Sequence, residues 1–274
     1  MKLDPTLRDI LLSCRCGEVT VDEAAHEIEG LRIENLAGIA RIDTGRSVRC
    51  GLPEVVLAEG KDSDKLTMIM FRHLDVTGRC IATRVTDEQA AAVNGEISES
   101  GVTAAYHRDA RVLVLSHGQP PEQTGGRVGI LTAGTVDIPV AEEARIIAEE
   151  AGCEVHTAYD VGVAGIHRLF TALREMPDVH AYVVAAGREG TLPAIVAGLT
   201  DRPVIGVPVS SGYGYMGRGE AALAGMLQSC SVLAVVNIDA GFVAGSFAAQ
   251  IANMVARHVT SGDPVTPHGG VKDE

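Results

Sequence analysis

The second half of the chain alternates regularly between short apolar runs and amphipathic segments, and this alternation constrains the fold more than any other feature. Strands that alternate with helices form βαβ units and hence a parallel sheet. The sequence therefore predicts an α/β fold whose C-terminal part is a three-layer parallel-sheet domain. Predicted strands occupy Val128–Leu131, Glu154–Thr157, Ala181–Ala185, Val204–Val207 and Leu233–Ile238, with helices near 139–151, 163–175, 190–198, 219–229 and 242–257.

The composition agrees with a sheet that is buried on both faces. The 274 residues include no Trp, 5 Tyr and 4 Phe, so Val, Ile, Leu and Ala must fill the core, as in parallel sheets covered by helices. The 23 Lys and Arg against 36 Asp and Glu give a net charge of −13, which argues against nucleic acid as a partner because such proteins need a basic surface. A nucleotide-sized ligand is compatible with this charge, since backbone amides can hold a phosphate.

The first half predicts a smaller, mixed α+β domain. Helical spacing begins at Leu7 and recurs after Asp22, the expected N-cap of a second helix. The Gly-, Pro- and Gln-rich stretch 116–126 has no periodicity and is expected to be a linker. The predicted domains are therefore residues 1–115 and 127–258, followed by a flexible tail at 259–274. Further elements are predicted as strands near Ile39–Ile42, Val55–Leu57, Cys80–Val85 and Ala104–His107, and as helices near 63–73 and 87–93.

Cysteine usage and the N-terminal sequence favour the cytoplasm. The 6 Cys include no CxxC pair, and Cys14-x-Cys16 lacks a matching pair at zinc spacing. Asp4, Arg8 and Asp9 fall where a signal peptide needs apolar residues, so reduced thiols are expected. The uncharged run 221–238 is predicted to be a helix followed by a buried strand, not a membrane span, because polar residues interrupt its middle.

The loops that follow the predicted strands are the expected location of a site, because parallel sheets bind ligands at the carboxyl ends of their strands. After the first strand, Gly134 allows close backbone approach and Thr135 supplies a hydroxyl before a helix, which suits a phosphate. Alternatively, Thr135 or Asp137 caps that helix. After the third strand, Arg188 and Glu189 are expected to face a cleft or another subunit. Glu189 has two interpretations: it is a general acid or base, or it is an ordinary carboxylate that the dipole at a helix N-terminus favours.

Two further features have two interpretations each. The loop Pro208–Gly219 is rich in glycine and hydroxyl groups, which suits a phosphate or ribose contact or a mobile flap. Cys230 ends the helix predicted at 219–229, where it is either a small buried hydrophobe or a reactive thiol. The dipole at a helix C-terminus disfavours a thiolate, so a reactive Cys230 needs a positive charge from elsewhere, such as a cationic substrate.

Three segments in the second half, Val128–Leu131 leading to Asp137, Glu154–Ala158 and Pro203–Val209, follow one another in a recognisable order. In this order the chain resembles the aminoimidazole ribonucleotide (AIR) carboxylase family, of PurE type. That family has a catalytic His in a Ser-Ala-His-Arg motif, whereas this chain has Thr157-Ala158-Tyr159-Asp160. Chemistry of the purine type would therefore lack its histidine.

A second set of motifs extends from about residue 35 to residue 257. They lie at Asp43–Arg46, Gly51–Val56, Glu59–Lys61, Gly134–Ala144, Asp160–Arg168, Ser229-Cys230 and Val236–Phe242. With these motifs the chain resembles the pyridinium-3,5-biscarboxylic acid mononucleotide synthase family, of LarB type. The loop 210–220 departs from the pattern at Met216, Arg218 and Glu220.

This resemblance implies an enzyme that carboxylates C5 of the pyridinium ring of nicotinic acid adenine dinucleotide, with CO2 or bicarbonate. The enzyme also cleaves the phosphoanhydride, which gives the dicarboxylated mononucleotide and AMP in nickel-pincer nucleotide biosynthesis. By the match, Cys230 is the nucleophile that adds transiently to C4, so that C5 can attack CO2. Glu189 and Asp137 complete the implied catalytic set, and the fold implies a homo-oligomer, an octamer in the PurE-type family.

Phosphoanhydride cleavage suggests Mg²⁺, although no Asp/His cluster in the sequence fixes its ligands; no organic cofactor besides the dinucleotide substrate is expected. Arg46, Arg49 and Lys61 of the first domain are expected either to hold the substrate or to serve surface solubility. The alternative functions are an AIR carboxylase or mutase of purine biosynthesis and a non-catalytic nucleotide-binding assembly module. Candidate substrate-binding residues are Thr132, Gly134, Thr135, Asp160, Gly187, Arg188, Ser210, Gly212, Asn237 and Asp239.

Overall fold

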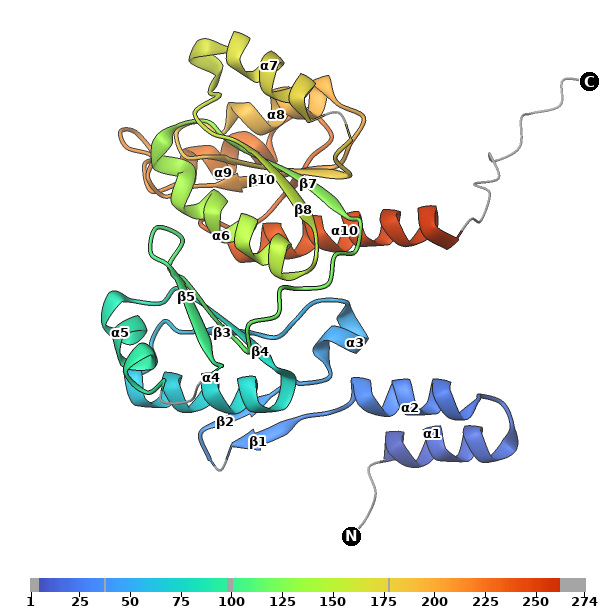
Figure 1. Cartoon of the computed structure of the whole chain (residues 1–274). Helices are drawn as coiled ribbons and strands as arrows, with labels where there is room; N and C mark the ends of the chain where they lie inside the picture. Colours follow the sequence, from blue (N-terminus) through green and yellow to red (C-terminus); the bar gives the residue numbers. More distant parts are fainter. Residues whose placement is uncertain (1–4, 37, 98–100, 177, 262–274) are drawn as a thin grey trace, which may run out of the picture. The chain divides into compact units, whose positions relative to one another are not determined.

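The computed structural model describes residues 5–36, 38–97, 101–176 and 178–261, which form two compact units (Figure 1). The first unit comprises the chain up to Pro121 together with Ile138–Ala151, and the second comprises Glu122–Asp137 and the chain from Gly152 onward. Helix α10 (Gly241–Ser261) continues past residue 259, where the sequence predicts the tail to begin. The remainder of that predicted tail, 262–274, lies outside the described residues.

The first unit contains a four-stranded mixed sheet with the order β3-β4-β6-β5. Strand β3 runs parallel to β4, and β6 runs antiparallel to both of its neighbours. The strands are β3 (Val55–Leu57), β4 (Arg79–Thr83), β5 (Thr103–His107) and β6 (Val112–Ser116). The sequence predicts no strand at the position of β6, although all residues of β6 are buried. A short and continuously apolar strand lacks the alternation that marks a half-buried one.

Helices α4 (Ser63–Thr77) and α5 (Asp87–Gly95) pack with this sheet, which confirms the helices predicted near 63–73 and 87–93. The N-cap of α2 is Thr20 and not the predicted Asp22. The Thr20 side chain accepts a hydrogen bond from the Glu23 N–H, and the Glu23 side chain accepts one in return from the Thr20 N–H, so a capping box fixes the helix start. The remaining elements are α1 (Pro5–Cys16), α2 (Val21–Gly30), β1 (Glu34–Leu36), β2 (Ala40–Ile42) and α3 (Arg46–Cys50).

Helix α6 (Ile138–Glu150) groups with the first unit, whereas the sequence analysis places it in the second domain. Two polar contacts join it to β4. Arg79 forms an ion pair with Glu150, and the buried Thr83 hydroxyl donates a hydrogen bond to the buried Glu143 carboxylate. These contacts join residues that are far apart in the sequence, so the local strand–helix pattern contains no sign of them.

The second unit contains a five-stranded, wholly parallel sheet, as predicted (Figure 1). Its strands are β7 (Arg127–Thr132), β8 (Glu154–Ala158), β9 (Ala181–Ala186), β10 (Val204–Pro208) and β11 (Ala234–Val235). They lie in the order β11-β10-β9-β7-β8, and β11 is shorter than the predicted Leu233–Ile238. From β7 the chain moves to β8 on one side and then to β9 on the other. Such a reversal opens a crevice at the carboxyl ends of the two strands that flank it.

Helices cover both faces of this sheet. Helices α7 (His167–Glu175), α8 (Thr191–Leu199) and α9 (Glu220–Leu227) pack on one face. On the opposite face, α10 lies on the central strands and buries Ala244, Ala248 and Ala252, whose small side chains allow a close approach. The uncharged run 221–238 forms most of α9 and then β11, as predicted. Across the described residues, no helix is both long and apolar enough to cross a membrane.

Candidate active site

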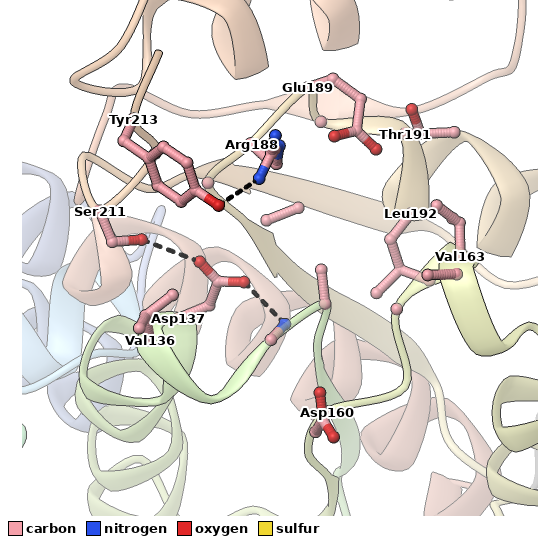
Figure 2. Close-up of a pocket in the computed structure, with 18 of the residues that line it drawn as sticks. Val136, Asp137, Asp160, Val163, Arg188, Glu189, Thr191, Leu192, Ser211 and Tyr213 are labelled. Atoms are coloured by element: carbon pink, nitrogen blue, oxygen red, sulfur yellow. Dashed lines mark hydrogen bonds between the residues drawn. The ribbon is translucent and has the colours of Figure 1, made fainter.

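A pocket of about 340 Å³ lies at the carboxyl end of the parallel sheet, beside the reversal in strand order (Figure 2). The loops that follow β7, β8, β9 and β10 line it, so its walls come from four separate parts of the sequence. The sequence-predicted candidates that line the pocket are Gly134, Asp137, Asp160, Gly187, Arg188, Glu189 and Gly212.

Asp137 is a buried carboxyl group in the wall of this pocket, with only 3% of its surface exposed. Its Oδ2 accepts a hydrogen bond from the Gly134 N–H at 2.9 Å, and its Oδ1 accepts one from the Ser211 hydroxyl at 3.2 Å. Burial raises the pKa of Asp137 above its ordinary value, although these hydrogen bonds act in the opposite direction. Asp137 can therefore hold a proton at a higher pH than an exposed carboxyl, as an acid–base group requires.

Two glycines allow the loops after β9 and β10 to meet at Asp137. A Cβ on Gly187 would lie 2.7 Å from the Ser211 Oγ and 2.9 Å from the Asp137 Oδ1. A Cβ on Gly212 would lie only 1.9 Å from the carbonyl oxygen of Gly187. Any side chain at either position would separate the two loops. These glycines therefore place the Ser211 hydroxyl within reach of the Asp137 carboxylate.

Asp160 and Arg168 form an ion pair on the β8 side of the pocket. The Arg168 Nη1 lies 2.5 Å from the Asp160 Oδ2, and both residues line the pocket. Asp160 has a left-handed backbone with φ of 56°, and its N–H donates to the Thr132 Oγ1 at 2.9 Å. Thr132 is completely buried and does not line the pocket. Its hydroxyl instead holds the loop that carries Asp160.

On the opposite wall, Arg188 and Tyr213 contact each other, as Figure 2 shows. The Arg188 Nη1 donates a hydrogen bond to the Tyr213 hydroxyl at 2.6 Å, and the guanidinium carbon lies 4.6 Å from the centre of the ring. Glu189 follows Arg188 directly and also lines the pocket. This wall therefore presents a cation, an aromatic face and a carboxylate side by side.

Other predicted site residues lie outside the pocket lining. Thr135 is exposed and does not line the pocket. Ser210 and Asp239 contact each other, because the Ser210 N–H donates to the Asp239 Oδ1 at 2.8 Å. Asn237 is exposed, and its Oδ1 accepts a hydrogen bond from the Ile238 N–H at 2.9 Å. Substrate-binding roles for these residues stay predictions.

Cys230 also lies outside the lining of this pocket. Helix α9 starts next to the carboxyl end of the sheet and its eight residues carry the chain about 12 Å along the helix axis before Cys230 is reached. The following residue, Ser231, is fixed to α8 by a hydrogen bond from its hydroxyl to the Ala194 carbonyl oxygen at 2.9 Å. Cys230 is exposed on its own chain and is therefore not part of the core of that chain, and its role as a nucleophile stays a prediction.

Four polar residues of the pocket were not among the sequence-predicted candidates: Arg168, Thr191, Ser211 and Tyr213. Arg168 belongs to the motif Asp160–Arg168, but only the fold of the chain between them brings the two side chains together. Ser211 and Tyr213 belong to the Gly-rich loop Pro208–Gly219. The composition of this loop predicted a binding segment, but it did not single out these two residues. The apolar part of the lining includes Val136, Val163 and Leu192.

The described residues contain no group of three or more His, Cys, Asp or Glu side chains arranged to hold a metal ion. Because Mg²⁺ is commonly held by one or two carboxylates together with phosphates of a substrate, the Mg²⁺ expected from phosphoanhydride cleavage stays a prediction. In the first unit, Arg49 is paired with Asp43, Arg46 lies 3.6 Å from Glu54, and the Lys61 Nζ donates to a backbone carbonyl. These contacts support a structural role for the three cations.

Two sequence families match the chain. The family described as LarB/PurE-like N-terminal domain matches residues 33–117, and the family described as AIR carboxylase matches residues 127–262. An uncharacterized protein of Methanocaldococcus jannaschii is 42% identical over 255 residues, which cover 91% of this chain and 98% of that protein. The match to this archaeal protein thus includes both parts of the chain.

The N5-carboxyaminoimidazole ribonucleotide mutases of Thermotoga maritima and Pyrococcus horikoshii are 33% and 34% identical to the chain. Each match covers 31% of this chain, and it covers 51% and 49% of the respective mutase. These relatives support a carboxylase or mutase fold for the matched part, in agreement with the parallel sheet. The chain therefore belongs to the LarB-type family, in which a LarB/PurE-like N-terminal domain precedes an AIR carboxylase domain.

Proposed function

We propose that the protein carboxylates C5 of the pyridinium ring of nicotinic acid adenine dinucleotide and cleaves the phosphoanhydride of this substrate. The products are pyridinium-3,5-biscarboxylic acid mononucleotide and AMP. The observation that carries the proposal is the presence of a LarB/PurE-like N-terminal domain and an AIR carboxylase domain in one chain. The pocket supports it, because no histidine is found among the described residues of its lining.

The pocket also suits the charges of this dinucleotide. The substrate carries anionic phosphates, an anionic carboxylate and a cationic ring. Arg188 supplies positive charge on one wall of the pocket and Glu189 supplies negative charge beside it, while Arg168 is paired with Asp160 on another wall. Opposite charges within one pocket favour a ligand that itself carries both signs.

A thiolate solves the chemical difficulty of this reaction. A pyridinium ring is electron-poor, so its C5 does not attack CO2 directly. Addition of the Cys230 thiolate to C4 gives a neutral dihydropyridine, in which C5 is an enamine carbon and forms a bond to CO2. A carboxylate base, assigned to Glu189, then removes the C5 proton, and expulsion of the thiolate from C4 restores the aromatic cation. The thiolate is regenerated, and CO2 replaces one proton on the ring.

The position of Cys230 supports a site that includes a second copy of the chain. Cys230 is exposed and does not line the pocket of its own chain. A thiol must reach C4 of the bound ring to form a bond. We therefore place the Cys230 thiol of one copy at the pocket of a neighbouring copy, in a symmetric homo-oligomer.

Mass spectrometry tests the reaction itself. The protein is incubated with nicotinic acid adenine dinucleotide and bicarbonate, and in parallel with aminoimidazole ribonucleotide or its N5-carboxy derivative. One added carboxylate together with release of AMP is the expected result. Conversion of only the purine intermediates would identify a purine-type carboxylase or mutase, and no conversion of any of them would favour a non-catalytic nucleotide-binding module.

Mixing of two inactive variants tests the arrangement of the site. Cys230→Ser and Glu189→Gln are co-purified as mixed oligomers. If thiol and pocket come from different copies, about a quarter of the sites in a random one-to-one mixture contain both native groups, and activity returns. If both groups act within one chain, every site retains one defect and the mixture stays inactive.

A further inference from the structure

The aromatic face of Tyr213 is occupied by a positive charge. The guanidinium carbon of Arg188 lies 4.6 Å from the centre of the Tyr213 ring, within the range of a cation–π contact. Both residues line the pocket, and 73% of the Tyr213 surface is exposed (Figure 2). Because the ring is not buried in a core, packing does not explain its position. The contact shows that this face already attracts a cation.

The backbone brings the loop that carries Tyr213 to this wall. Its neighbour Gly212 lies so close to Gly187 that a Cβ on Gly212 would be 1.9 Å from the Gly187 carbonyl oxygen. Gly187 in turn precedes Arg188. The loops that carry Tyr213 and Arg188 are therefore joined at adjacent residues, and the ring faces the pocket without support from an apolar core.

Arg188 has no carboxylate partner among the ion pairs of the described residues, unlike Arg168, which is paired with Asp160. Its interactions are the hydrogen bond to the Tyr213 hydroxyl and the contact with the ring. A guanidinium group in a pocket without an acidic partner is available to an anion. Displacement of Arg188 from the ring by a ligand would thus expose an aromatic face and free a cation at the same wall.

We propose that Tyr213 recognises the positive charge of the substrate ring, which replaces Arg188 on the Tyr213 face while Arg188 turns to an anionic group of the same substrate. This inference rests on the proposed function, because a pyridinium ring is the cation in question. Arg188 leaves the face of the Tyr213 ring as the pyridinium ring arrives, so the Tyr213 ring contacts a cation both before and after binding. Tyr213 is thereby the residue that distinguishes the charged pyridinium from a neutral dihydropyridine.

Binding of two dinucleotides that differ in ring charge tests this role. The full-length protein is titrated calorimetrically, in CO2-free buffer, with nicotinic acid adenine dinucleotide and with its reduced form, whose ring is neutral. Tyr213→Leu should weaken binding of the oxidised form about tenfold and leave the reduced form nearly unchanged, whereas Tyr213→Phe should retain the preference because it keeps the aromatic face. Arg188→Gln should weaken both forms to a similar extent, because both carry the same anions.

Tyr215→Leu is the matched control, since Tyr215 lies in the same loop, is 94% exposed and does not line the pocket. It should bind both dinucleotides like the wild type. Equal weakening of both forms by Tyr213→Leu, no weakening by it, or the same effect from Tyr215→Leu overturns the inference. If the wild type converts the dinucleotide in those cases, the proposed function stands. If the wild type does not convert it, the proposed function fails.

Discussion

Replacement of Gly212 by alanine tests the close approach that shapes the pocket. The added Cβ would lie 1.9 Å from the Gly187 carbonyl oxygen and 2.9 Å from its carbonyl carbon. Cβ atoms essentially never lie closer than 3.0 Å to another heavy atom, so one loop must move by about 1.1 Å. Overpacking of this kind costs about 1–3 kcal/mol. The same movement would break the hydrogen bond from the Ser211 hydroxyl to the Asp137 Oδ1, whose oxygen atoms lie 3.2 Å apart.

Two measurements follow for Gly212→Ala. Urea denaturation should show a lower midpoint with an unchanged slope, which indicates a change of stability alone. Turnover should fall by about 100-fold, because a displacement of roughly 1 Å in a site has effects of that size. Gly198→Ala in α8 is the control, since its Cβ would have no heavy atom within 4 Å and should stabilise the protein by roughly 0.5–1 kcal/mol. Wild-type stability and turnover in Gly212→Ala would refute the proposed approach of the loops.

Three further substitutions have defined outcomes. Burial raises the pKa of Asp137 in the folded chain, so the wild type loses stability as pH rises above 3.8 and this carboxyl group must give up its proton. Asp137→Asn has no such proton to lose and should therefore become more stable relative to the wild type over this pH range. Urea denaturation at a series of pH values measures the difference. His73→Gln should reduce the loss of thermal stability as pH falls below 6.5, because burial lowers the folded pKa of His73 and protonation favours the unfolded chain. Arg79→Met should cost about 1–3 kcal/mol by leaving the mostly buried Glu150 unpaired, and adding Glu150→Met should recover part of this cost in a double-mutant cycle.

The parallel sheet could be predicted because its signal is local. A buried strand followed by an amphipathic helix is visible within about 30 residues of sequence, and five such repeats leave little choice of architecture. The mixed sheet of the first unit depends on pairings that are less local. Strand β6 pairs with β4, from which α5 and β5 separate it in the sequence. Its continuous apolar sequence was also too short to distinguish a strand from part of a helix.

The candidate site was predictable at the level of loops and much less at the level of residues. The sequence predicted a site at the carboxyl ends of the strands, because Asp137, Arg188 and Glu189 follow predicted strands. The structure brings these three residues to one pocket. Thr132 follows the same rule, yet its side chain is buried beneath the pocket wall, where it supports Asp160. Alternation along a strand decides which residues face a pocket, and a shift of one residue reverses the direction of a side chain.

The fold class, the loops in which ligands of such a sheet are bound and the family of the chain could all be inferred from the order of its amino acids. These properties rest on local periodicity and on contiguous motifs, both of which can be read along the chain. The folded chain was needed to show that the ring of Tyr213 lies against Arg188, that Ser211 reaches Asp137, and that Cys230 lies away from the pocket of its own chain. The physical reason is that these relations depend on the order of the strands and on close contacts between loops distant in sequence, which no local pattern encodes.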